Sequence, residues 1–173
     1  MKQILFCLSL LVAFASCTKS TVTVDNSTIL RSGKWKATAY TVKYQMYGVD
    51  TVYDIYKNMD TCRFDDYLTF DSSYKGAQYS ATKKCGGELD EMNFDWALKN
   101  NQTTLILNNA QYTIGYWKAT PELQKGNEYV EAKITKINSR TFTITYETTL
   151  MPPALPPYPY PVTLHFTHTF TKM

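Results

Sequence analysis

RTFTITYETT, residues 140–149, and VTLHFTHTFT, residues 162–171, alternate apolar and polar side chains with a period of two. In the first stretch, one face carries Phe142, Ile144 and Tyr146, and the other carries mostly threonine. The second stretch places on one face Val162, Leu164, Phe166, His168 and Phe170. A period of two is typical of strands with one buried and one solvated face, as in antiparallel sheets. Both stretches are therefore predicted to be antiparallel strands.

Most of the chain after residue 30 has the same character. We predict further strands at residues 34–44, 66–71, 78–83, 93–98, 103–108, 112–117 and 129–137. Hairpin turns are predicted at residues 48–50, 99–102 and 137–140. Residues 54–62 are expected to form a short helix or an irregular crossing. Short strands joined by hairpins predict an all-β fold, which closes as an antiparallel up-and-down barrel of about eight to nine strands or packs as a sandwich.

The first predicted strand carries apolar side chains on both of its faces. Alternation places Trp35 and Ala37 on one face and Tyr40 and Val42 on the other. We expect one of these two sets to point into the core.

The N-terminus has the pattern of an export signal. A basic start precedes an apolar run at residues 4–15, which is shorter than the roughly 20 residues that span a bilayer. The run ends in Ala15-Ser16-Cys17, which resembles a bacterial lipobox. We expect residues 1–16 to be removed, Cys17 to be acylated, and residues 17–30 to form a flexible stalk. The alternative is an ordinary signal peptide with an incidental cysteine.

The residue that follows the lipobox cysteine indicates the location of the protein. Thr18 after the cysteine, in place of an aspartate, favours the outer membrane of a Gram-negative cell, facing the periplasm or the cell surface.

The net charge of +3 is small and scattered, which argues against a nucleic-acid partner. In an exported domain, Cys62 and Cys85 are most simply a disulfide. A metal or redox site is the alternative, and no CxxC motif or neighbouring histidine favours it.

Four short motifs follow one another behind the lipobox. They are SGKWKATAYTV (32–42), CRFDDYLTFDSS (62–73), TKKCGGE (82–88) and FDWALKNNQTTLILNN (94–109). Their order resembles the lipocalin-like domain of small bacterial lipoproteins. The resemblance implies a calycin-like barrel over residues 31–173 with a Cys62–Cys85 bridge, and it implies no activity, because fold alone does not give function. The proline-rich stretch at residues 151–161 departs from the family pattern. It is interpreted as a rigid connector or, alternatively, as a lid or docking surface.

Aromatic side chains are the main candidates for binding. The chain has 14 tyrosines, and inward rings suit apolar ligands or sugar rings. The predicted ligand-binding residues are Trp35, Phe142, Tyr146, Phe166 and His168. The alternative is that these side chains simply fill the core.

No residues are predicted to be catalytic or to bind a metal. His165 and His168 lie three apart on one strand and face opposite sides, so they cannot share one metal ion. Asp65, Asp66, Asp71 and the run at residues 88–95 offer carboxylates, but GGELDEMNFD (86–95) lacks the spacing of a calcium loop. We therefore expect a non-enzymatic lipoprotein without a cofactor, whose barrel binds a small apolar or amphipathic molecule. The alternative is a module that docks an envelope protein or a glycan on its outer surface.

Overall fold

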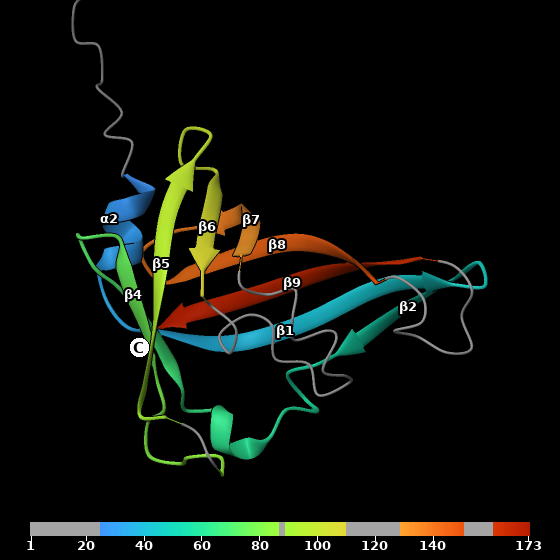
Figure 1. Ribbon diagram of the computed structural model, residues 1–173, viewed down its shortest axis with the longest axis horizontal. Helices are drawn as coiled ribbons and strands as arrows, with labels where there is room; N and C mark the ends of the chain where they lie inside the picture. Colours follow the sequence, from blue (N-terminus) through green and yellow to red (C-terminus); the bar gives the residue numbers. More distant parts are fainter. Residues whose placement is uncertain (1–24, 87–88, 110–128, 151–160) are drawn as a thin grey trace, which may run out of the picture.

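The computed structural model of this chain describes residues 25–86, 89–109, 129–150 and 161–173. Its main elements are β1 (Trp35–Met46), β2 (Val49–Asp54), β3 (Tyr67–Phe70), β4 (Lys75–Tyr79), β5 (Glu91–Lys99), β6 (Thr104–Asn108), β7 (Tyr129–Ile137), β8 (Thr141–Leu150) and β9 (Val162–Lys172). Neighbouring strands pair antiparallel in the order β1-β3-β4-β5-β6-β7-β8-β9, and β9 returns to β1 (Figure 1). The strands thus form a closed eight-strand up-and-down barrel, with β2 as an extra strand outside the ring.

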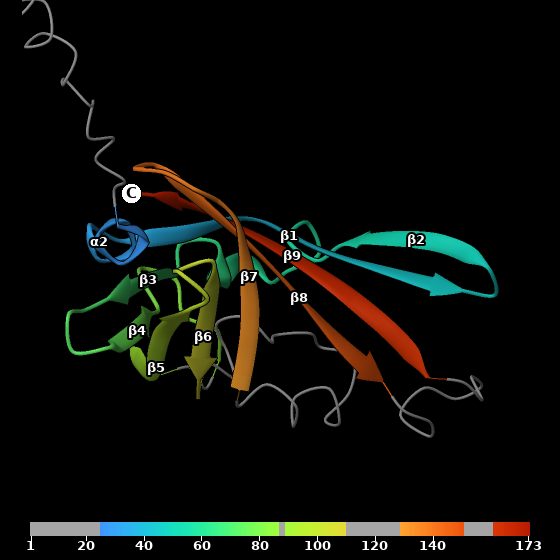
Figure 2. The same cartoon turned by 90° about the horizontal axis from the view of Figure 1, so that it is seen from above.

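β1 closes the ring with a long pairing to β9 on one side and a short pairing to β3 on the other. β1 pairs with β9 from Trp35↔Lys172 to Tyr44↔Leu164, but with β3 only through Trp35↔Leu68 and Lys36↔Tyr67. Past these two pairs β1 and β3 separate, and β1 continues beside β9 toward the β1–β2 hairpin (Figure 2). The barrel wall therefore has an opening between β1 and β3.

A β-bulge in β1 changes which side chains face the core. The register against β9 shifts between Ala37 and Ala39, which leaves Thr38 as an extra residue. Such a residue reverses the alternation. Trp35 and Tyr40 are consequently both buried, so the expectation that only one set of β1 side chains points inward is wrong.

The strand predictions fail mainly where alternation is weak. The turn predicted at residues 48–50 lies one residue earlier, because Tyr47 and Gly48 have positive φ and β2 begins at Val49. β4 ends at Tyr79, so the predicted strand at 78–83 is misplaced; three consecutive buried residues in β4 give no period of two. The predicted strand at 112–117 lies outside the described residues, as does most of the proline-rich stretch.

Helix α2 (Asn26–Arg31) closes one end of the barrel. Asp25 caps it by accepting a hydrogen bond from the Ser27 amide, and Leu30 is fully buried. The Leu30 carbonyl accepts a 2.6 Å hydrogen bond from the Trp35 indole. The C-terminal part of the predicted stalk is therefore helical and packed, and residues 17–24 lie outside the described residues.

Aromatic rings fill the centre of the barrel beside this helix. Phe142 stacks on Phe170 at 4.6 Å and meets Trp35 edge-on at 5.0 Å. Phe70 packs edge-on against Phe94 at 5.6 Å. Buried rings in such arrangements contribute about 0.5–1.5 kcal/mol per pair beyond the area they bury.

Gly76 is predicted to be indispensable to this packing. It pairs with Phe70 on one side and Phe94 on the other, and a Cβ there would overlap the Phe94 ring and lie 2.8 Å from the Thr69 carbonyl oxygen. Gly76→Ala should lower the free energy of unfolding by about 1–3 kcal/mol, measured by urea denaturation. Gly86→Ala is the matched control, because no atom lies within 4 Å of its added carbon. Equal stabilities of the two variants would contradict this account of the core.

Candidate functional site

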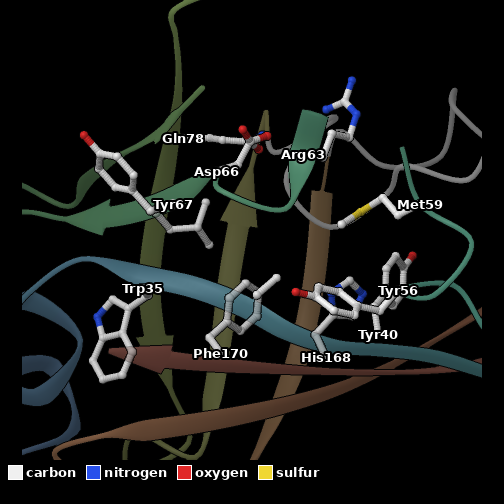
Figure 3. Close-up of a pocket in the computed structure, with 12 residues that line it drawn as sticks. Trp35, Tyr40, Tyr56, Met59, Arg63, Asp66, Tyr67, Gln78, His168 and Phe170 are labelled. Carbon is white, nitrogen blue, oxygen red and sulfur yellow. The ribbon is translucent and has the colours of Figure 1, made fainter. Parts of the chain in front are cut away.

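A cavity lies in the opening between β1 and β3. Residues 55–66, which we call the crossing segment, connect β2 to β3 over this opening and include a short 3-10 helix, η1 (Thr61–Arg63). The cavity beneath the crossing segment has a volume of about 50 Å³ (Figure 3). It is lined by Trp35, Ala37, Tyr40, Tyr56, Met59, Arg63, Asp66, Tyr67, Leu68, Gln78, His168 and Phe170.

One wall of the cavity is aromatic. β1 contributes Trp35 and Tyr40, and β9 contributes His168 and Phe170 (Figure 3). The rings of Tyr40 and His168 lie against each other with their centroids 3.6 Å apart and their planes tilted by 33°. This wall offers flat faces on which an apolar group can pack.

The opposite wall is polar. Gln78 of β4 is only 4% exposed, and its Nε2 donates a 3.1 Å hydrogen bond to Asp66 Oδ2. Gln78 Oε1 is buried and has no hydrogen-bond partner among the described residues. A buried acceptor without a partner costs about 1–3 kcal/mol. This acceptor therefore suits a bound group that carries an N–H or O–H.

The crossing segment is attached to the barrel at three points. Cys62 is joined to Cys85 by a disulfide with a Cα–Cα distance of 5.4 Å, as the family resemblance implied. Asp65 Oδ2 accepts hydrogen bonds from the amides of Thr82 and Lys83, at 2.9 and 3.2 Å. On the β1 side, the Tyr56 amide donates a 3.0 Å hydrogen bond to the Tyr40 carbonyl. These attachments hold the crossing segment over the cavity.

Hydrogen bonds connect two side chains of the aromatic wall, Tyr40 and His168, to the buried Tyr146. His168 Nε2 and the Tyr146 hydroxyl share a 3.4 Å hydrogen bond. The Tyr146 hydroxyl also forms a hydrogen bond with the Tyr40 hydroxyl. Burial lowers the pKa of His168 from 6.5 to about 3 and raises the pKa of Tyr40 well above its usual range. These three side chains are therefore uncharged at neutral pH.

The structure divides the five predicted ligand-binding residues into two groups. Trp35 and His168 line the cavity. The other three do not line it: Phe142 lies in the packed centre, whereas Tyr146 and Phe166, which stack at 4.9 Å, line a second, larger pocket.

The sequence pattern did not reveal the polar wall of the cavity. Gln78 lies in a strand without clear alternation, and Asp66 stands out in the sequence only as part of the CRFDDYLTFDSS motif and as a candidate carboxylate. The available signal was that CRFDDY places an arginine and two aspartates close to a cysteine.

A second, larger pocket of about 580 Å³ is lined by residues of β7, β8 and β9 and by Thr103 and Thr104, with both outward-facing polar side chains and the buried rings of Tyr146 and Phe166. His165, on the outward face as alternation predicts, lies there with Nδ1 2.8 Å from Glu147 Oε1. Among the described residues, no three His, Cys, Asp or Glu side chains are grouped as metal ligands. Within the same residues, no helix is long and apolar enough to cross a bilayer.

Similarity to known proteins concerns the fold. No protein-family model matches the sequence, and no curated protein matches it. Among solved structures, the chain is similar to a lipocalin-like protein from Bacteroides uniformis (13% identity, TM-score 0.43, 84% of this chain and 99% of that chain covered). It is also similar to an uncharacterized protein from Bacteroides eggerthii (12% identity, TM-score 0.42, 82% and 98% covered). The predicted antiparallel up-and-down barrel is confirmed by the strand pairing, and these similarities carry no argument about function.

The disulfide should contribute measurably to stability. Cys62 and Cys85 are 23 residues apart, and a loop of that length stabilises by about 3 kcal/mol in the chain-entropy model. Replacing both cysteines by serine should lower the free energy of unfolding by that amount in urea denaturation. Wild-type protein in a reducing agent should match the double variant. An unchanged midpoint in both samples would contradict the clamping role of this bridge.

Burial of neutral His168 predicts a specific pH dependence. The unfolded histidine binds a proton below about pH 6.5, whereas the folded one stays neutral down to about pH 3. The unfolded state therefore binds more protons in this window, and stability falls as the pH decreases, by at most about 1.4 kcal/mol per pH unit. His168→Gln should remove this slope.

The measurement is the difference between the wild-type and His168→Gln free energies of unfolding from pH 7 to pH 4. The difference cancels the contributions of exposed carboxylates whose pKa values are lowered by hydrogen bonds, namely Asp25, Asp50 and Asp71. Parallel curves for the two proteins would contradict a buried, neutral His168.

Proposed function

We propose that this protein is a non-enzymatic binding protein that holds a small amphipathic molecule in the cavity between β1 and β3. The observation that carries the proposal is the buried, unpaired Gln78 Oε1 facing an aromatic wall. Ligand pockets typically combine apolar lining with a few polar groups that fix orientation. The cavity has this composition.

The cavity size limits the ligand. Whole drug-sized ligands occupy roughly 300–1,000 Å³, whereas this cavity measures about 50 Å³. The cavity is large enough for several water-sized groups but far smaller than a site for a whole drug-sized ligand. The ligand is therefore small, or only one end of a larger ligand enters beneath the crossing segment.

The lining also indicates the chemistry of the ligand. Gln78 Oε1 accepts hydrogen bonds and Arg63, which also lines the cavity, donates them, so the polar end of the ligand carries an N–H or O–H donor and can carry an acceptor as well. Its apolar part packs on Tyr40 and Phe170.

We further propose that the barrel is tethered to the outer membrane through acylated Cys17, facing the periplasm or the cell surface. The support is the sequence pattern of the N-terminus. Two or more acyl chains anchor a protein stably, whereas a single chain binds weakly. A ligand would then be captured outside the cytoplasm.

Filling the cavity should abolish binding without disturbing the barrel. Ala37 lines the cavity, whereas Ala39, on the same strand beyond the bulge, is exposed. Native mass spectrometry of protein purified from its own membranes should show an excess mass that denaturation removes. We expect this excess in the wild type and in Ala39→Leu and expect it to be absent in Ala37→Leu.

The control separates two failures of the proposal. An excess that persists in Ala37→Leu would place the ligand elsewhere on the protein. Folded wild-type protein without any excess would favour the alternative function, a module that docks an envelope protein or a glycan on its outer surface.

A further inference from the structure

Strand β2 is an exposed edge. Among the described residues it pairs only with β1, and the β1–β2 hairpin projects from the barrel (Figures 1 and 2). Val49 and Val52 are 63% and 66% exposed. An exposed edge with apolar side chains is a ready template for another strand.

The hairpin register defines which backbone groups face outward. Met46 and Val49 flank a two-residue turn, so they form a hydrogen-bonded pair. Along the hairpin, the following residue pairs alternate between non-hydrogen-bonded and hydrogen-bonded pairs. Val49, Thr51 and Tyr53 therefore direct their backbone groups toward β1. Asp50 and Val52 direct theirs to the open edge.

The charges on β2 are already compensated within the chain. Asp50 lies 2.7 Å from Lys43 Nζ and accepts a hydrogen bond from Gln45, and Asp54 lies 3.5 Å from Lys57 Nζ. A partner strand therefore does not need positive charges to neutralise Asp50 and Asp54. A strand of the same composition as β2, with apolar residues and aspartates that are already paired with lysines, is compatible with this edge.

We propose that β2 pairs antiparallel with β2 of a second copy of this chain, with Thr51 on the two-fold axis. In this register, Val49 lies opposite Tyr53 of the partner subunit, a favourable pairing of β-branched and aromatic side chains. Asp50 and Val52 exchange backbone hydrogen bonds with each other across the edge. A register centred on Val52 would instead place Asp50 opposite Asp54 of the partner subunit, and like charges in that position are unfavourable.

The interface is isologous, as a two-fold axis requires. Because β2 has only six residues, the dimer is weak in solution and depends on concentration. The residues that pair in this interface, 49–53, are not among those that line the cavity, so dimerisation does not require a bound ligand. The inference therefore stands independently of the proposed binding function.

Cysteine cross-linking of the full chain tests this register. Thr51→Cys places a thiol directly opposite its own copy, whereas Val52→Cys, at an exposed position, faces Asp50 of the partner subunit. Mild oxidation should convert Thr51→Cys to a covalent dimer on non-reducing gels, well beyond Val52→Cys and the wild type. Sedimentation velocity of the wild type should show a dimer that grows with concentration.

A second variant keeps the test independent of cysteine chemistry. Val52→Pro removes a donor from the open edge, where proline is tolerated, and should weaken dimerisation by about tenfold or more while leaving the circular dichroism spectrum unchanged. A monomer at every concentration, a dimer insensitive to Val52→Pro, or preferential cross-linking of Val52→Cys would each overturn the proposal.

Discussion

The short pairing between β1 and β3 is the constraint on which the other features depend. Two residue pairs hold these strands together, whereas β1 stays paired to β9 along most of its length. The opening that results must be covered, because it exposes the edge of the core. The crossing segment covers it, and the Cys62–Cys85 bridge with the Asp65 hydrogen bonds holds that cover to the barrel.

The same constraint explains why the cavity lies in the wall and not in the centre of the barrel. Eight strands leave room for packed side chains or one small ligand. Here Trp35, Phe142 and Phe170 fill the central space beside α2. The remaining space lies where β1 and β3 separate, with rings from β1 and β9 on one side and Gln78 and Asp66 on the other.

Alternation in the sequence was sufficient to predict an all-β fold and the strands β7, β8 and β9, because each of these strands buries one face. The choice of a barrel over a sandwich came from the family resemblance. Alternation could not predict the bulge at Thr38, which depends on pairing with β9. It also could not predict the cavity, since Gln78 and Asp66 meet only after β3 and β4 pair. The aromatic residues could be identified from the sequence as facing the barrel interior. Which of them border a cavity depends on how closely their neighbours pack, and the sequence does not show this.

The most direct test of ligand binding in the barrel wall is a high-resolution crystal structure of the protein purified from its native source, with attention to the atoms near Gln78 Oε1. We expect electron density for a small non-water group that donates a hydrogen bond to this oxygen and packs against Tyr40 and Phe170. Ordered water alone in the cavity, or a crossing segment that leaves no cavity between β1 and β3, would contradict this expectation.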